Sequence, residues 1–102
     1  MLGELGESLA VRFLSRHGLD VFATNVAVGR GEVDVVANDG LRRVVVEVRT
    51  TTGRGDPIDA VDLSKRRKVE GLGWLLGADR VDFLGVGVSK NGVDVHWVPG
   101  SV

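Results

Sequence analysis

The chain has 102 residues, of which 43% are hydrophobic and 26% are charged, with a net charge of −1 and no cysteine. This length suits one domain, residues 1–102, and is too short for two separate cores. The lack of cysteine excludes disulfides and thiolate metal sites and fits a reducing cytoplasm. We see no secretory leader and no apolar run near ~18 residues, so we expect no membrane partner.

The first third of the chain predicts one helix followed by one strand. Apolar side chains recur at roughly helical spacing over residues 5–17, and Gly18 is well placed to end that helix. A short strand is expected at about 19–24, and a glycine-bearing loop at 28–31.

A β-hairpin is expected next. Two runs rich in β-branched residues, 32–37 and 41–50, flank Asp39-Gly40, a dipeptide that favours a two-residue hairpin loop. The pairs expected across this hairpin are Asn38 with Leu41, Asp34 with Val45, and Glu32 with Glu47.

Side chains alternate across a strand, so this register separates apolar from charged residues. One face of the hairpin is expected to be apolar and to consist of Val33, Val35, Ala37, Val44, Val46 and Val48. The other face receives Glu32, Asp34, Glu47 and Arg49. Clustered carboxylates repel one another, and a bound cation would relieve this repulsion more fully than Arg49 alone. From the spacing alone, a salt-bridged sheet surface exposed to water explains the pattern equally well.

The second half predicts a loop, a helix and two strands. A polar, glycine-rich loop spans 50–56, and Pro57 is placed to begin a short helical turn. A longer helix is expected from an Asp62 cap to Leu76, followed by strands at 80–88 and 93–98. We therefore expect an α/β fold with a mixed β-sheet flanked by helices, in the order αβββαββ.

Basic residues are concentrated in the middle of the chain. Nine of the thirteen lysines and arginines lie between Arg30 and Lys68, including the block Lys65-Arg66-Arg67-Lys68. Such clustering is what nucleic-acid binding requires, even at a net charge near zero. A solvated helical face explains this block equally well, since its side chains cannot all face one partner.

Several motifs fall together in the order and spacing of a known family. They are Gly6-Glu7, Asn25, Gly31-Glu32-Val33-Asp34, Val46-Glu47-Val48-Arg49, Lys65 and Arg80-Val81-Asp82-Phe83. In these motifs the chain resembles the YraN-like family over nearly its whole length. That family is similar to a branch of the restriction-endonuclease-like (PD-(D/E)xK) superfamily, whose members include archaeal Holliday-junction resolvases.

The resemblance implies a role for each acidic residue. Asp34 and Glu47 would bind a metal ion, with the backbone carbonyl of Val48 nearby. Glu7 would reach over the sheet to complete or orient the site, and Glu32 would bind the ion or support a ligand. Mg²⁺ or Mn²⁺ suits such oxygen ligands, and the ion would activate water and polarise a phosphate.

The chain departs from these relatives at Arg49, where most carry lysine. Arginine neutralises phosphate charge well through its planar fork, but its pKa above ~12 makes it a poor proton acceptor. Three possibilities follow: an enzyme of altered efficiency, an enzyme that uses another lysine such as Lys65, or a nucleic-acid binder that has lost catalysis.

The leading hypothesis is a cytoplasmic, Mg²⁺-dependent endonuclease-like protein that acts on DNA phosphodiesters, on branched or single-stranded DNA. Its catalytic residues would be Glu7, Asp34, Glu47 and Arg49, with Lys65, Arg66 and Lys68 on the nucleic acid. The alternatives are a non-catalytic nucleic-acid-binding module of the same fold and a protein-interaction domain whose acidic face is structural. By analogy with resolvases, a homodimer would suit a symmetric junction.

Overall fold

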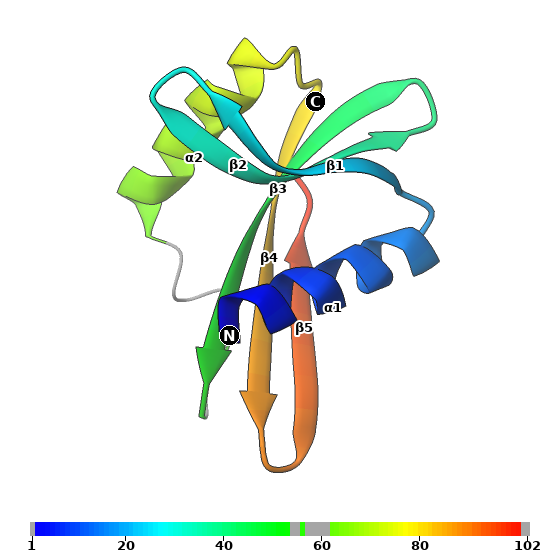
Figure 1. The fold of residues 1–102 in the computed structure, drawn as a ribbon, viewed down its shortest axis with the longest axis vertical. Helices are drawn as coiled ribbons and strands as arrows, with labels where there is room; N and C mark the ends of the chain where they lie inside the picture. Colours follow the sequence, from blue (N-terminus) through cyan, green and yellow to red (C-terminus); the bar gives the residue numbers. More distant parts are fainter. Residues whose placement is uncertain (1, 54–55, 57–61, 101–102) are drawn as a thin grey trace.

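Residues 2–53, 56 and 62–100 are described by the computed structural model (Figure 1). Within these residues the chain forms α1 (Leu2–Arg16), β1 (Asp20–Val28), β2 (Gly31–Asp39), β3 (Arg42–Thr52), α2 (Leu63–Leu75), β4 (Arg80–Ser89) and β5 (Gly92–Val98). The predicted order αβββαββ is confirmed. The short helical turn expected at Pro57 lies outside the described residues. None of the described helices is long and apolar enough to cross a membrane.

The five strands form one mixed sheet in the order β1-β2-β3-β4-β5. Neighbouring strands are antiparallel except β3 and β4, which pair in parallel from Val44↔Arg80 to Thr52↔Val88. A parallel pair needs a crossover connection, and α2 lies in that connection. The mixed sheet that the sequence predicted is therefore confirmed.

One helix packs on each face of the sheet. Ala10 and Leu14 of α1 are fully buried against valines of β2 and β3 and against Leu84 of β4. On the opposite face, Val69 of α2 packs with a second set of buried residues that includes Val45 and Phe83. Figure 1 shows α1 crossing the sheet and α2 lying beside its upper half. The sheet is therefore apolar on both sides, which explains the long valine runs of its central strands.

The β2–β3 hairpin differs from the expected register by two residues. Asp39 pairs with Arg42, and Val36 rather than Asp34 faces Val45, so the loop is Gly40-Leu41. Gly40 has a φ of +63°, a conformation that glycine adopts without steric cost, and Leu41 projects fully into solvent. A shift of two residues preserves which side chains share a face, so the gathering of charged residues survives the correction.

The expected alternation of β2 is wrong at Val33. Val35 and Ala37 pack on the α1 side as predicted, but Val33 packs with Val36 and Val45 on the α2 side. The strand therefore changes its facing across Asp34. A uniform period of two could not predict this change.

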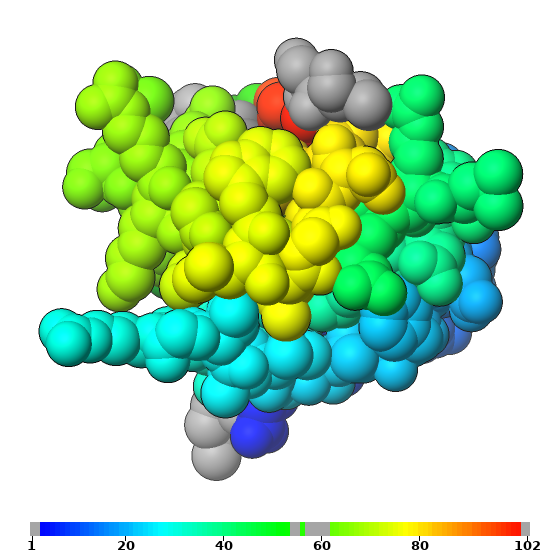
Figure 2. Space-filling model, turned by 90° about the horizontal axis from the view of Figure 1, so that it is seen from above, coloured from blue at the N-terminus to red at the C-terminus, as the bar shows by residue number. Residues whose placement is uncertain are grey.

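The β1–β2 hairpin and α2 are in direct contact. A Cβ atom added to Gly31 would lie 2.7 Å from Leu72 Cδ1, so a larger residue there would force the Leu72 side chain to shift. Figure 2 shows the hairpin residues, in cyan, lying against the yellow end of α2. At its other end α2 is capped by Asp62, as predicted, whose carboxylate accepts a hydrogen bond from Lys65 N at 2.8 Å.

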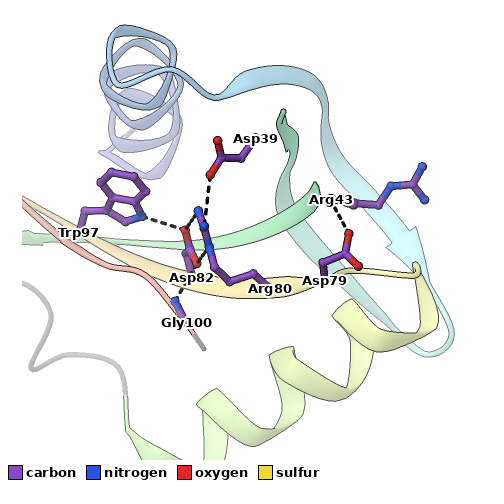
Figure 3. Close-up of polar contacts among 7 residues, drawn as sticks. All are labelled: Asp39, Arg43, Asp79, Arg80, Asp82, Trp97 and Gly100. Atoms are coloured by element: carbon purple, nitrogen blue, oxygen red, sulfur yellow. Dashed lines mark hydrogen bonds and ion pairs between the residues drawn. The ribbon is translucent and has the colours of Figure 1, made fainter. Parts of the chain in front are cut away.

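A buried carboxylate lies near the N-terminal end of β4. Asp82 is completely buried, and Arg80 donates to both of its oxygens, at 2.8 Å from Nε and 3.1 Å from Nη2. Trp97 Nε1 and Gly100 N donate to the same carboxylate at 2.9 and 2.8 Å (Figure 3). Because the charge is fully hydrogen-bonded, this part of the family motif has a structural role that ties β5 to β4.

Candidate functional site

A pocket of about 300 Å³ lies where α1 meets the ends of β2 and β3. Residues of α1, β1, β2 and β3 line it, namely Gly3, Glu7, Asn25, Glu32, Asp34, Val48, Arg49 and Thr50. Three of the four residues of the predicted charged face (Glu32, Asp34 and Arg49) therefore open into one pocket. Glu7 joins them from the helix, as the resemblance implied. We call these lining residues and the adjoining Glu47 the carboxylate pocket.

Close contact between α1 and β3 brings Glu7 to this pocket. A Cβ atom on Gly6 would overlap the side chain of Thr50. Only glycine therefore lets the helix backbone come this near the strand. The Gly6-Glu7 pair of the sequence thus has a simple meaning, because the glycine provides the approach and the next residue provides the carboxylate.

Asp34 lies where the pairing of β2 with β3 ends. Val35↔Val46 is the last pair of that ladder on this side. Beyond this pair, the Asp34 side chain replaces the backbone as the hydrogen-bond acceptor, since its Oδ2 accepts a hydrogen bond from Val48 N at 2.8 Å. The carboxylate is thereby fixed between the strands and points toward the pocket.

Glu47 is the most perturbed acid of the site. Its side chain is buried, at 7% exposure, and Lys65 Nζ lies 3.8 Å from its Oε2. Burial raises the pKa of Glu47 to about 8, helped by a hydrogen bond with Asp34 and by the charge of Asp34, whereas Lys65 and Arg49 oppose the rise. In the absence of a cation, Glu47 therefore favours its protonated form at neutral pH.

Glu7 experiences the same crowding from the other side of the pocket. Its pKa is raised by burial first, and then by the negative charges of Asp34, Glu32 and Glu4. The carboxylates of α1, β2 and β3 therefore act on one another electrostatically, although they come from distant parts of the sequence. Repulsion of this kind favours either a proton or a cation in the pocket.

Asn25 is a further residue of the site, one that the sequence places among the family motifs without assigning it a role. It lies in β1 with a φ of +52°, the only positive φ at a described residue other than glycine. With its amide nitrogen turned toward its acceptor-only neighbours, it donates to Glu7 Oε1 at 2.8 Å and to Glu32 Oε1 at 3.2 Å. In the sequence, Asn25 is an asparagine shortly before a glycine-containing loop. That position does not predict hydrogen bonds to Glu7 and Glu32.

The predicted basic residues do not act as one group. Arg49 is exposed at the pocket rim, and Lys65 reaches Glu47 from α2. Arg66 instead turns to β4, where its guanidinium lies 5.4 Å from the centre of the Phe83 ring, and Lys68 is exposed. Only Lys65 of the three predicted helical contacts therefore reaches the acidic residues.

The donor atoms of the pocket suit a hard divalent cation. In the described part of the chain, no three acidic or histidine side chains are close enough together to hold one ion. The close pair is Asp34 and Glu47. Mg²⁺ usually binds through one or two carboxylates and completes its shell with water and phosphate oxygens. These two residues therefore fit such an ion, and Glu7 and Glu32 add negative charge around it.

Sequence comparison identifies the family of the chain. The model of the uncharacterised protein family UPF0102 matches residues 6–86. The chain belongs to UPF0102. This confirms the YraN-like resemblance at the level of the family, and the matched span contains Glu7, Asn25, Asp34 and Glu47.

Relatives in UPF0102 resemble the chain over most of its length. A UPF0102 protein of Thermotoga petrophila is 38% identical over 95 residues, which cover 86% of each chain. One from Leifsonia xyli is 36% identical over 112 residues and covers 99% of this chain and 95% of its own. One from Symbiobacterium thermophilum is 42% identical over 76 residues, or 72% of this chain and 64% of its own.

The fold of this UPF0102 protein is also found in a solved structure. The crystal structure of SSO0001 matches 99% of this chain with a TM-score of 0.52 at 15% identity. The chain spans about half of that protein, 52% of its length. At this identity the likeness supports the αβββαββ fold alone.

Proposed function

We propose that this protein is a divalent-metal-dependent nuclease of the restriction-endonuclease-like superfamily that acts on DNA phosphodiesters. The observation that carries the proposal is that Glu7 and Asp34, from two separate elements, line one pocket, and that Glu47 of a third element is hydrogen-bonded to Asp34 beside it. Such crowding destabilises the free protein and has a clear use if a cation binds there. The family resemblance supports the same reading.

Each residue has a distinct task in this proposal. Asp34 and Glu47 hold the ion, and Val48 fixes the Asp34 carboxylate through its amide. When bound, Mg²⁺ or Mn²⁺ supplies positive charge that polarises a phosphate ester and makes water more acidic. Arg49, at the exposed rim, binds the phosphate oxygens as they gain charge. Glu7 orients the site from α1.

DNA is the proposed partner because basic side chains flank the carboxylate pocket. Lys65 of α2 lies 3.8 Å from the Glu47 carboxylate, Arg49 of β3 lines the pocket, and the positive charges of both lower the pKa of Glu47. A phosphate drawn to them would lie next to the metal ligands. Lys68 and the exposed part of Arg66 extend the positive charge along α2.

A cleavage assay with matched variants tests this function. Purified protein is incubated with branched, single-stranded and duplex DNA at low salt, with Mg²⁺, with Mn²⁺ or with EDTA. We expect metal-dependent cleavage that Glu47→Ala abolishes while the variant keeps its circular dichroism and melting behaviour. Glu70→Ala, a carboxylate of α2 outside the pocket, is the control and should cleave normally. Full cleavage by Glu47→Ala would exclude the assignment.

A second candidate, a nucleic-acid-binding module without catalysis, is favoured by Arg49. The guanidinium group of Arg49 stays protonated at neutral pH, so Arg49 cannot act as a general base in the way that a neutral lysine amine can. In that case the wild type binds DNA with strong salt dependence and cuts nothing. Arg49→Lys would then gain cleavage, whereas the same substitution in the nuclease changes only its rate.

A further inference from the structure

Asn25 occupies an unusual backbone position at the centre of the site. Strand β1 pairs Thr24 with Val35 and Val26 with Val33, which places Asn25 opposite Asp34. Its φ of +52° is in the left-handed region, which asparagine tolerates better than most residues. Burial along β1 also loses its alternation here, because Thr24 and Asn25 are both exposed. The two strands therefore change facing at the same level.

The side chain of Asn25 bridges two acidic residues, Glu7 and Glu32, that lie on different secondary-structure elements. Its amide group donates to Glu7 of α1 and to Glu32 of β2, at 2.8 and 3.2 Å. Both acids would otherwise be held apart by repulsion, since Glu32 is among the charges that raise the pKa of Glu7. An amide offers two donors and no charge, so one residue can hold both carboxylates.

We infer that Asn25 is a positioning residue, whose amide holds Glu7 and Glu32 at the mouth of the carboxylate pocket so that a divalent cation binds at Asp34 and Glu47. This inference rests on the proposed function and adds a residue to it. Glu7 lies on α1 and Glu32 on β2, and the hydrogen bonds of the Asn25 amide link the two carboxylates. Outer partners of metal sites typically contribute 10- to 100-fold to affinity.

Two substitutions separate the amide from the backbone. Glycine adopts a positive φ freely, so Asn25→Gly removes the amide and keeps the strand conformation. Alanine also removes the amide, but it is strained at this φ, so Asn25→Ala should in addition lower the melting temperature. Asn91→Gly, in the exposed β4–β5 turn, is the control for the loss of an asparagine.

Calorimetric titration of the full chain with Mn²⁺ is the measurement. We expect Asn25→Gly and Asn25→Ala to bind Mn²⁺ 10- to 100-fold more weakly than the wild type and Asn91→Gly to bind normally, with thermal stability reduced only in Asn25→Ala. Wild-type affinity in Asn25→Gly would overturn the inference, as would a loss confined to Asn25→Ala. If the wild type binds no Mn²⁺, the proposed function itself fails.

Discussion

The Asp34 carboxylate accepts a hydrogen bond from the backbone amide of Val48 at 2.8 Å. This contact continues the β2–β3 pairing with a side chain at the point where the strand ladder ends. It places a negative charge between the two strands, next to Glu47. The hydrogen bond that links β2 to β3 here therefore also places the charge of Asp34 where it raises the pKa of Glu47.

The first prediction separates these two roles of Asp34. Asp34→Asn keeps an oxygen acceptor for the Val48 amide and loses the charge, whereas Asp34→Ala loses both. We expect Asp34→Ala to be less stable than Asp34→Asn by about 1–3 kcal/mol, the cost of a buried amide without a partner. Urea denaturation of both variants measures the difference. Equal stability would mean that water replaces the carboxylate at Val48.

The second prediction concerns pH. The pKa of Glu47 is about 8 in the folded protein against an ordinary value of 4.5. The folded state therefore holds this proton more tightly than the unfolded chain does. The stability that the proton contributes is fully present below about pH 4.5 and is lost as the pH rises through about 8, at up to about 1.4 kcal/mol per pH unit.

Melting curves between pH 5 and 9 at low salt, without divalent ions, test this dependence. Glu47→Gln carries no titratable proton, so its melting temperature should fall much less over the range and should exceed that of the wild type at pH 8. Glu70→Gln controls for the loss of a carboxylate on the surface of α2. A parallel pH profile in wild type and Glu47→Gln would contradict the assignment of the pKa.

The third prediction is that Mg²⁺ or Mn²⁺ stabilises the fold, most strongly near pH 8. A cation that binds only the folded state at 100 times its Kd adds about 2.7 kcal/mol. At lower pH the proton on Glu47 competes with the cation, so the gain shrinks. Thermal melts with MgCl₂, compared with NaCl at equal ionic strength, measure the effect. Glu47→Gln should show no specific gain, and a gain equal to that of the wild type would place the ion elsewhere.

The fourth prediction uses two glycines of one helix. A Cβ atom at Gly6 would overlap Thr50, whereas one at Gly3 would meet nothing within 4 Å. Gly6→Ala should therefore push α1 off β3 and destabilise the fold by about 1–3 kcal/mol, while Gly3→Ala should be neutral or stabilising by up to about 1 kcal/mol. Urea denaturation of the two variants gives both values. A neutral Gly6→Ala would mean that the helix shifts without cost.

These contacts also explain how much the sequence could predict. Hydrophobic periodicity and the Asp62 cap were sufficient for the element order, because they depend on residues close in the chain. The hairpin register was two residues off, since both Asp39-Gly40 and Gly40-Leu41 offer a glycine for the loop. A shift of two residues alone preserves which side chains share a face, but β2 changes its facing across Asp34, and a uniform period of two could not predict that.

The site was predictable only in part, for a related reason. Asp34 and Glu47 belong to motifs on neighbouring strands, so strand alternation was enough to bring them near each other. The role of Asn25 depends on a left-handed φ and on contacts to two other elements, neither of which has a local sequence signature. Lys65 reaches Glu47 because α2 packs on the opposite face from α1, which only the tertiary structure establishes.

The last prediction concerns Asp82, which lies among the family motifs but outside the carboxylate pocket. Four donors converge on its buried carboxylate, two from Arg80, one from Trp97 and one from Gly100. Asp82→Ala would leave the Arg80 charge without this partner and should cost about 3–5 kcal/mol. Asp94→Ala, at an exposed position of β5, should change stability by less than about 0.5 kcal/mol.

Urea denaturation followed by tryptophan fluorescence measures both changes, since Trp97 donates to Asp82 and should respond to its loss. Mn²⁺ affinity of folded Asp82→Ala, measured below its unfolding transition, should equal that of the wild type. The reason is that Asp82 acts on β5 and Arg80, whereas the carboxylate pocket is built from α1, β1, β2 and β3. A fall in Mn²⁺ affinity without unfolding would mean that the two ends of the sheet are coupled.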